Sequence, residues 1–265
     1  MYVLMVGDVV GSPGRKVFAR FVALRKAAGR ADFVVVNAEN AAGGKGLTGD
    51  VAEELLNAGA DVVTLGDHTW DQKTIQTYLP QAERVIRPAN FAPGCPGRGL
   101  LTVSTAWGGV SVINLVGRVF MKPTDCPFRK ADELLKDAGA LGPTILVDMH
   151  AEATSEKIAM GRYLDGRVSA VVGTHTHVQT SDETVLPDGT AYITDLGMTG
   201  AKDSVIGRDI EPVMQTFLYG LPAKFSLARN DVTLEGVEID IDRRTGRART
   251  IERIRHRLEN GQGRA

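Results

Sequence analysis

The first two thirds of the chain alternate short apolar runs with amphipathic stretches. Five runs are apolar enough for buried strands, and they cover residues 3–7 (VLMVG), 33–37 (FVVVN), 61–66 (DVVTLG), 144–150 (TILVDMH) and 170–177 (AVVGTHTH). The first three begin about 30 residues apart, which is typical of parallel strands joined by crossover helices. The pattern therefore predicts a layered α/β fold.

The segments between these runs predict the remaining elements. Helical patterns cover residues 14–28, 50–58, 72–78, 131–141 and 155–163, with Ser12-Pro13 as the expected start of the first helix. Residues 84–118 hold short runs (84–86, 100–103 and 110–115) with a Gly108-Gly109 turn, which favours antiparallel pairing. The alternating tail, residues 214–256, predicts a second, hairpin-rich sheet, and residues 259–265 a frayed end. Because no repeat, low-complexity segment or linker interrupts the sequence, we expect one domain over residues 1–265.

Composition and charge narrow the possible partners. The chain has 31 Lys and Arg against 32 Asp and Glu, a formal net charge of -1, so no overall basic field favours nucleic acid or an anionic membrane. The N-terminal apolar stretch from Tyr2 to Val10 contains Asp8 and lacks the features of a signal peptide, and no stretch is long enough to span a bilayer. Cys95 and Cys126 show no CxxC spacing. We expect both thiols to be reduced and the protein to be cytoplasmic.

Polar residues that can bind metals follow each apolar run. In chain order they are Asp8, Glu39, Asn40, Asp67, His68, His150, His175 and His177. The carboxyl ends of parallel strands meet at one edge of a sheet, where α/β proteins place their sites. Mixed oxygen and nitrogen ligands suit Mn, Fe, Zn or Co better than Ca or Mg. If one histidine is set aside, seven candidate ligands remain. This number is too large for one open catalytic metal, which commonly has three protein ligands, and it fits two metals that share a carboxylate.

The His175-Thr176-His177 motif fits such a pair of metals. Residues two apart point the same way in a strand, but if the strand ends near them the two imidazoles can reach different ions. Two metals roughly 3.5–4 Å apart activate a bridging water and hold both oxygens of an in-line displacement. A histidine outside the ligand set could protonate the leaving group.

Several motifs together resemble one known family. They are GDVVG (7–11), NAEN (37–40), GDHTWD (66–71), RPANF (87–91), His150, GTHTHVQT (173–180) and DLGMTG-x-x-DSVIG (195–207). Their order and spacing resemble the YmdB-like branch of the calcineurin-like metallophosphoesterases across nearly the whole chain. This resemblance implies two β-sheets packed as a sandwich flanked by helices, a binuclear Fe or Mn centre with Zn possible, and hydrolysis of 2′,3′-cyclic nucleotides or related phosphodiesters.

The resemblance also implies a role for each site residue. One metal would be bound by Asp8, Asn40 and His177, and the other by Asp67, His150 and His175. Glu39 would bridge the two metals, a bridging water or hydroxide would be the nucleophile, and His68 would be the general acid.

Two positions depart from the wider superfamily. Its members open with Asp-x-His, whereas this chain has Asp8-Val9-Val10; in the YmdB-like branch the asparagine after the bridging glutamate, here Asn40, replaces that imidazole. Asp67 stands where the motif usually reads Gly-Asn-His. The additional carboxylate should bind metal more tightly but offset part of the charge that acidifies the water.

Other residues could contact the substrate, a small phosphodiester or nucleotide. Arg87 and Asn90 belong to the RPANF motif, which follows a short predicted strand, and Arg118 follows another short strand. Thr199 lies in a loop that is expected to border the site. The arginines are equally compatible with ordinary surface positions, and Thr199 with an ordinary turn. His256 lies in an arginine-rich alternating run and is interpreted as a residue on a solvated strand face.

Two other functions remain open. A metal-dependent amidohydrolase would normally carry His-x-His early and an acidic ligand late, the reverse of the order found here. A regulatory protein could keep the site to sense a nucleotide with little or no turnover, an alternative to which Asp67 gives weight. Self-association into a homo-oligomer is a further possibility suggested by the sheet-rich tail.

Overall fold

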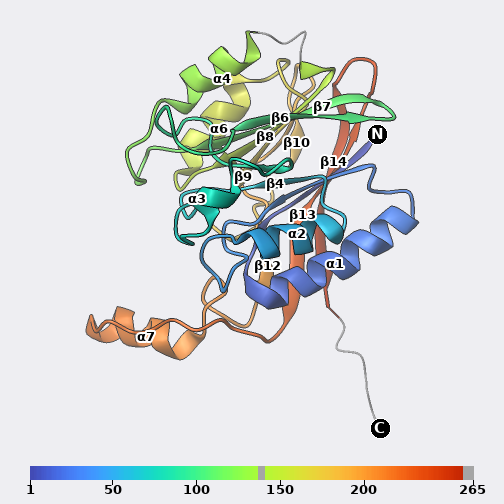
Figure 1. Cartoon of the computed structure of the whole chain (residues 1–265). Helices are drawn as coiled ribbons and strands as arrows, with labels where there is room; N and C mark the ends of the chain where they lie inside the picture. Colours follow the sequence, from blue (N-terminus) through green and yellow to red (C-terminus); the bar gives the residue numbers. More distant parts are fainter. Residues whose placement is uncertain (137–140, 259–265) are drawn as a thin grey trace.

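Two β-sheets pack face to face and carry helices on both outer faces (Figure 1). The computed structural model describes residues 1–136 and 141–258. In these residues, one sheet has eight strands in the order β2-β12-β13-β1-β3-β4-β5 with β14 beside β13, and the other has six in the order β10-β11-β9-β8-β7-β6. The arrangement confirms the predicted α/β class and the two-sheet sandwich.

The element bounds follow the apolar runs closely. The eight-stranded sheet contains β1 (Tyr2–Val6), β2 (Asp8–Val9), β3 (Phe33–Asn37), β4 (Val62–Thr64), β5 (Val85–Ile86), β12 (Met198–Ala201), β13 (Val232–Ile241) and β14 (Ala248–Arg257). The six-stranded sheet contains β6 (Leu100–Thr105), β7 (Gly108–Val116), β8 (Thr144–His150), β9 (Ala170–Thr174), β10 (Thr184–Val185) and β11 (Ala191–Ile193). The helices are α1 (Gly11–Ala27), α2 (Gly49–Asn57), α3 (Ile75–Tyr78), α4 (Pro127–Leu135), α6 (Thr154–Tyr163) and α7 (Ile210–Tyr219).

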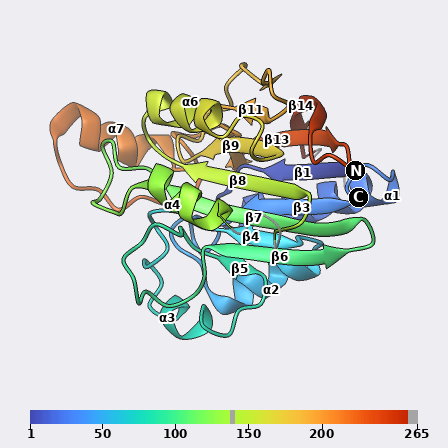
Figure 2. The same cartoon turned by 90° about the horizontal axis from the view of Figure 1, so that it is seen from above.

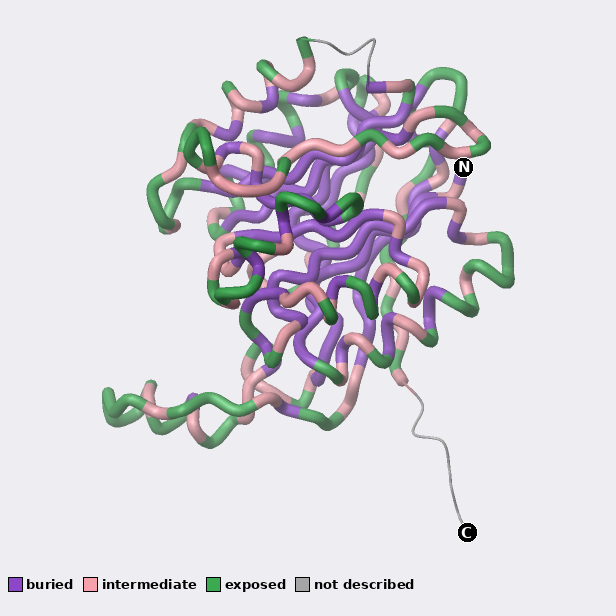
Figure 3. Tube along the Cα trace, viewed as in Figure 1, coloured by how far each residue is buried: buried purple, intermediate pink, exposed green. Residues whose placement is uncertain are grey.

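Alternate residues of the central strands enter different cores. In β1, Leu4 and Val6 pack under the outer helices, whereas Val3 and Met5 face the other sheet. This follows from the two-residue period of a strand. A third core lies beneath α4 and α6, which cover the outer face of the six-stranded sheet (Figure 2). The purple, buried segments in Figure 3 therefore run through both sheets.

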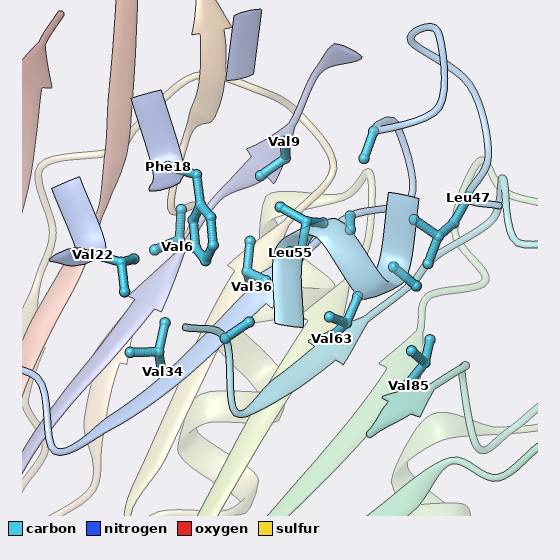
Figure 4. Close-up of a cluster of buried hydrophobic side chains, with 14 of the residues drawn as sticks. Val6, Val9, Phe18, Val22, Val34, Val36, Leu47, Leu55, Val63 and Val85 are labelled. Atoms are coloured by element: carbon cyan, nitrogen blue, oxygen red, sulfur yellow. The ribbon is translucent and has the colours of Figure 1, made fainter. Parts of the chain in front are cut away.

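The outer core of the eight-stranded sheet shows how the helices are held. Phe18 and Val22 of α1 and Leu55 of α2 pack against strand residues such as Val36 (Figure 4). The side chain of Thr48 accepts a hydrogen bond from the amide of Val51 and caps the start of α2. The α1 and α2 helices therefore fix the segments that follow β1 and β3, and these segments carry Asp8, in the short strand β2, and the Glu39-Asn40 pair.

The structure corrects the prediction for the tail. The β13 and β14 strands form the expected hairpin, but they extend the first sheet, because β13 pairs antiparallel with β1 and places Tyr2 opposite Asp240. The second sheet is built from residues 100–193 instead. The start of the predicted tail belongs to a helix, α7. Sequence alternation indicates a half-buried strand but carries no information on which distant strand it pairs with.

Smaller corrections concern single elements. The 84–86 segment forms β5 and pairs parallel with β4, whereas β6 and β7 are antiparallel as predicted. The turn of that hairpin falls at Ala106-Trp107, just before Gly108. The first helix begins at Gly11, and α4 begins earlier than predicted because Pro127 occupies its first turn. The predicted helix end at residues 137–140 and the predicted frayed end lie outside the described residues.

The α7 helix projects from the body of the protein (Figure 1, orange). Phe217, Leu218 and Tyr219 are strongly exposed there, and only Val213 of this helix is buried. Self-association remains a prediction. Within residues 1–136 and 141–258, no helix combines the length and apolarity needed to cross a membrane.

Candidate metal centre

The layer between the sheets changes from apolar to polar at the carboxyl ends of the parallel strands. Val35 of β3 and Leu146 of β8 face each other's sheet, and the next residues on the same strand faces are Asn37 and Asp148. Both polar residues are buried, and the Asn37 amide donates to Asp148 Oδ2 over 3.2 Å. The predicted site residues lie next to these two buried polar residues.

Four of the predicted ligands converge around His150. Its Nε2 atom lies 3.3 Å from Glu39 Oε1, 3.2 Å from Asp67 Oδ1 and 3.0 Å from His175 Nδ1. One donor atom from each of these four residues lies within 4.8 Å of all the others. Glu39 and His150 are fully buried, while Asp67 and His175 are about one fifth exposed. The group can therefore hold a metal at the base of an open cavity.

The other three predicted ligands lie beside this group. His177 Nε2 is 3.3 Å from the Asn40 amide and 3.7 Å from Asp8 Oδ1, and Asn40 Nδ2 donates to Glu39 Oε1 over 3.2 Å. Glu39 thus contacts both groups through a single oxygen. The structure brings all seven predicted ligands together around this carboxylate.

The ligands come from both sheets, which corrects the expectation of a single sheet edge. Asp8, Glu39 and Asp67 leave the ends of strands in the eight-stranded sheet. His150 and the His175-Thr176-His177 loop leave β8 and β9 of the six-stranded sheet. One sheet supplies the carboxylates and the other the imidazoles. Any cation bound here would join the two.

The His175-Thr176-His177 segment has an unusual backbone conformation. His175 and His177 have φ values of 100° and 64°, in a region that residues other than glycine seldom adopt. The buried Asp195 carboxylate fixes the segment, because its Oδ2 accepts from Thr176 N over 3.1 Å and from Lys157 Nζ over 2.6 Å. Since β9 ends at Thr174, neither histidine is in a strand, and the two imidazoles face different groups of ligands.

Hydrogen bonds leave one nitrogen of each ligand imidazole free to face the centre. The Thr174 hydroxyl donates to Asp148 Oδ1 over 2.7 Å, so it can accept from His150 Nδ1 at 2.9 Å and leave Nε2 as the acceptor. His177 Nδ1 lies 3.1 Å from the Ile206 carbonyl, which again leaves Nε2. His175 uses Nε2 toward Glu152 Oε2 at 3.1 Å and turns Nδ1 inward. Such partners orient metal-binding histidines.

The charges of the centre depend on one another. Burial opposes the charged form of Asp8, but the nearby charge of His177, 3.7 Å away, holds the pKa of that carboxyl well below its usual range. Burial likewise opposes ionisation of Asp67, but its contacts with His150 and His175 lower the pKa of this carboxyl well below its usual range. The nearby carboxylates raise the pKa of His150 well above its usual range despite its burial. Asp8 and Asp67 are therefore ionised beside these imidazoles.

The donor set fits a metal pair. Asp8 Oδ1 is buried, and among the described residues it has no hydrogen-bond partner, which is costly for a carboxylate unless a cation binds it. Gly66 approaches the centre so closely that a Cβ atom there would lie 2.4 Å from Glu39 Oε2 and from His150 Nε2. The backbone at residue 66 therefore leaves room only for these ligand atoms. The mixture of carboxylate, amide and imidazole groups suits Mn, Fe or Zn.

His68 lies next to the ligands, and one nitrogen of its ring faces Asp71. Its backbone amide donates to Glu39 Oε2 over 2.9 Å, and its Nδ1 lies 2.7 Å from Asp71 Oδ2. Asp71 also pairs with Lys45 Nζ at 3.1 Å. His68 is partly exposed in the same cavity as His177, a position from which it can reach a bound molecule. Asp71 was missed in the sequence, although it lies three residues after His68 in GDHTWD.

The predicted substrate contacts are not among the residues that converge around Glu39, although Thr199 lies in β12 beside the strand of Asp8. Asn90 is fully buried, and its amide nitrogen donates to the carbonyls of Val116 and Asp125, so it holds a loop and faces no cavity. Thr199 is also buried and donates to the Glu235 carbonyl. Arg118 is exposed, but it lines a separate cavity. None of the three belongs to the four-residue group around His150, and their contact with substrate stays a prediction.

Two further interpretations are revised by packing. Arg87 is buried, and its guanidinium donates to backbone carbonyls that include those of Pro88 and Cys95, so it stabilises a loop. His256 stacks on Phe21 with ring centroids 4.9 Å apart and is partly buried, so it lies on a packed strand face, away from the centre. Cys95 and Cys126 are free thiols, as predicted.

Comparison with known proteins identifies the family. A family model described as YmdB-like protein matches residues 4–254. A 2′,3′-cyclic-nucleotide 2′-phosphodiesterase of Bacillus subtilis (strain 168) is 51% identical over 254 residues, which cover 96% of each chain. Among solved structures, a hypothetical protein of Thermus thermophilus is 42% identical with a TM-score of 0.90, covering 97% of this chain and 99% of that one. A novel phosphatase of Mycoplasma pneumoniae is 35% identical with a TM-score of 0.91, covering 97% and 93%. The chain belongs to the YmdB-like protein family.

Proposed function

We propose that this protein is a phosphodiesterase that uses two metal ions to hydrolyse 2′,3′-cyclic nucleotides. The chain is a phosphoesterase, as its full-length likeness to proteins named phosphodiesterase and phosphatase indicates. The cyclic-nucleotide specificity is inferred from the name of the Bacillus subtilis relative. The observation that carries the proposal is the convergence of three carboxylates, one carboxamide and three imidazoles around Glu39.

The seven ligands divide into two sets in this proposal. Glu39 contacts residues of both sets and would bridge the metals. The sets that it would join are Asp8, Asn40 and His177 on one side and Asp67, His150 and His175 on the other. The metals, iron or manganese with zinc as a third possibility, would acidify a bound water and neutralise charge on the phosphate.

His68 is proposed to handle the leaving oxygen. Hydrolysis adds the oxygen of water to phosphorus and breaks one of the two phosphorus–oxygen ester bonds of the cyclic phosphate. Breaking the bond to O2′ leaves a 3′-phosphate and requires a proton on O2′. His68 lies beside the ligands with Asp71 on its Nδ1, so its Nε2 can carry that proton into the cavity.

One experiment tests both the activity and the metals. The protein is purified with Mn²⁺, its metal content is measured by elemental analysis, and products from 2′,3′-cyclic AMP are separated by chromatography. We expect two metals per chain, turnover to 3′-AMP, and a loss of roughly 10²- to 10⁴-fold in kcat for His68→Ala. His256→Asn, which removes the histidine that stacks on Phe21, is the matched control and should retain wild-type turnover.

The Glu39→Gln variant tests the bridge separately. Glutamine keeps the size of the side chain but removes its charge, so both metals should be bound more weakly. A Glu39→Gln protein that retains both metals would exclude the bridge. Nucleotide binding by the wild type without turnover would contradict the enzyme and favour the sensing alternative.

A further inference from the structure

We propose that a small apolar pocket beside Asp67 binds the nucleobase of the substrate, an inference that rests on the proposed function. The pocket has a volume of about 250 Å³ and is lined by Trp70, Phe91, Met121 and Pro123 as well as Asp67. A nucleobase is a flat aromatic ring system, and aromatic side chains bind such rings by stacking on either face.

The aromatic pair gives the pocket a rigid wall. The Trp70 and Phe91 rings lie with centroids 5.7 Å apart and planes tilted by 36°. Trp70 is partly buried and packs against the core under α1 and α2, which fixes its plane. Phe91 lies in the loop that the Arg87 guanidinium holds through backbone carbonyls, with that guanidinium 6.0 Å from the Phe91 ring centroid. A wall fixed before binding loses little entropy when a ring stacks on it.

The pocket borders the candidate centre at Asp67 and borders the proposed acid through its partner Asp71. Asp67 lines the pocket and contacts His150 in the four-residue group. Asp71 also lines the pocket and lies 2.7 Å from His68. A cyclic phosphate over the ligands, with its ester oxygens toward His68, would therefore direct its nucleoside toward Trp70.

A larger cavity, which His68 and His177 line, offers a competing place for the base. It has a volume of about 670 Å³ and includes Lys45, Arg208, Phe217 and Phe225 in its lining. Phe217 is 80% exposed on the projecting α7, and no aromatic partner among the described residues stacks on it. The basic residues suit phosphate oxygens, whereas the paired rings of Trp70 and Phe91 suit a base.

Kinetics with one substrate that has a nucleobase and one that lacks it distinguish the two candidate binding places for the base. We compare 2′,3′-cyclic AMP with glycerol 1,2-cyclic phosphate, which presents a cyclic phosphodiester but no base. Trp70→Leu keeps an apolar side chain and removes the aromatic face, so kcat/KM for 2′,3′-cyclic AMP should fall about tenfold to a hundredfold, mainly through KM. Turnover of glycerol 1,2-cyclic phosphate should stay unchanged, and Trp70→Phe should recover most of the loss.

Controls and contrary outcomes follow from the same comparison. Trp107→Leu, in the distant turn between β6 and β7, should leave both substrates unaffected. An equal loss on both substrates in Trp70→Leu, or no loss, would overturn the proposal. So would a base-specific loss in Phe217→Ala that Trp70→Leu does not show, because the base would then lie in the larger cavity.

Fluorescence tests the pocket without turnover. The chain has two tryptophans, so Trp107→Phe leaves Trp70 as the sole tryptophan emitter. In one Mn²⁺ buffer, 3′-AMP should quench this emission by stacking, whereas inorganic phosphate should not. Binding of 3′-AMP seen by calorimetry without quenching, or absence of any binding, would overturn the pocket proposal. Quenching by 3′-AMP in a protein that hydrolyses no cyclic nucleotide would instead support the pocket and refute the proposed function.

Discussion

Replacing Asp67 by asparagine tests whether the additional carboxylate strengthens metal binding. Asp67 Oδ1 lies 3.2 Å from His150 Nε2 and 3.4 Å from His175 Nδ1, so it faces the same point as both imidazoles. Asn has the same shape and keeps an oxygen donor there. The substitution therefore removes one negative charge and little else.

The magnitude follows from the position of the charge. Two unit charges about 4 Å apart interact by about 4 kcal/mol at an effective dielectric constant of 20. Asp67 is 20% exposed, so solvent screens part of this energy. We expect the affinity for Mn²⁺ to fall by roughly a hundredfold, equivalent to about 2.7 kcal/mol.

Thermal unfolding at a fixed Mn²⁺ concentration measures this loss. At 100 times the wild-type Kd, one site stabilises the folded protein by about 2.7 kcal/mol; after a hundredfold loss of affinity the same site contributes about 0.4 kcal/mol. The difference corresponds to a metal-induced Tm increase that is roughly 5–9 °C smaller in Asp67→Asn than in wild type.

The matched control is Asp71→Asn, the same substitution four residues later. Asp71 pairs with His68 and Lys45 and does not belong to the four-residue group around His150, so its metal-induced Tm shift should equal that of wild type. Equal shifts for Asp67→Asn and wild type would refute the assignment of Asp67 as a ligand. At saturating Mn²⁺ the kcat of Asp67→Asn should match or exceed wild type, because a less negative ligand set acidifies water more strongly.

Three further changes have distinct expected outcomes. Asp71→Asn should lower kcat about tenfold without changing KM, because a neutral amide orients His68 less strongly than a charged partner; unchanged kcat would contradict that role. Thr174→Val should weaken Mn²⁺ binding about 10- to 100-fold in a chelator competition by removing the hydrogen-bond partner of His150 Nδ1, and wild-type affinity would contradict the proposed tautomer. Gly66→Ala should lose bound metal in elemental analysis, since its Cβ would lie 2.4 Å from His150 Nε2; retention of two metals would mean that the loop can move away.

The strands and most candidate ligands were predictable because both have local signals. An apolar run that stops at Asp8, Glu39 or His150 indicates both a buried strand and the end of that strand at which the site residues lie. The structure brings all these residues together as expected, and their roles as ligands remain proposals. His68 is likewise placed beside the centre.

Sheet membership was not predictable from the sequence. Parallel strands buried on both faces have the same apolar composition in either sheet, so β3 and β8 look alike. The β1–β13 pairing joins residues such as Tyr2 and Asp240 that lie far apart in the chain. No local pattern records that register, which depends on how the whole sandwich closes.

The residues that support the centre carry a weaker signal. Asn37, Thr64 and Asp148 occupy strand positions two residues beyond apolar ones that face the other sheet, a spacing that assigns them to the same layer. Burial raises the pKa of Asp148 to about 6, so this carboxyl is tuned by the protein interior and not by solvent. Such residues are recognised only once the facing sheet is known, because their partners come from it.

The division of ligand types between the sheets explains why the polar layer is confined to one edge. Buried carboxylates of the first sheet would repel each other if the imidazoles of the second did not face them, and ionised groups gain little from burial without partners. Below Asn37 the same interface is filled by residues such as Val35 and Leu146, whose burial favours packing of the sheets. The apolar part can therefore hold the two sheets at a fixed separation, and the polar edge can retain for a cation the Asp8 oxygen that accepts no hydrogen bond from the described residues. The stability of the sandwich and the chemistry of its edge thus depend on the same spacing between β3 and β8.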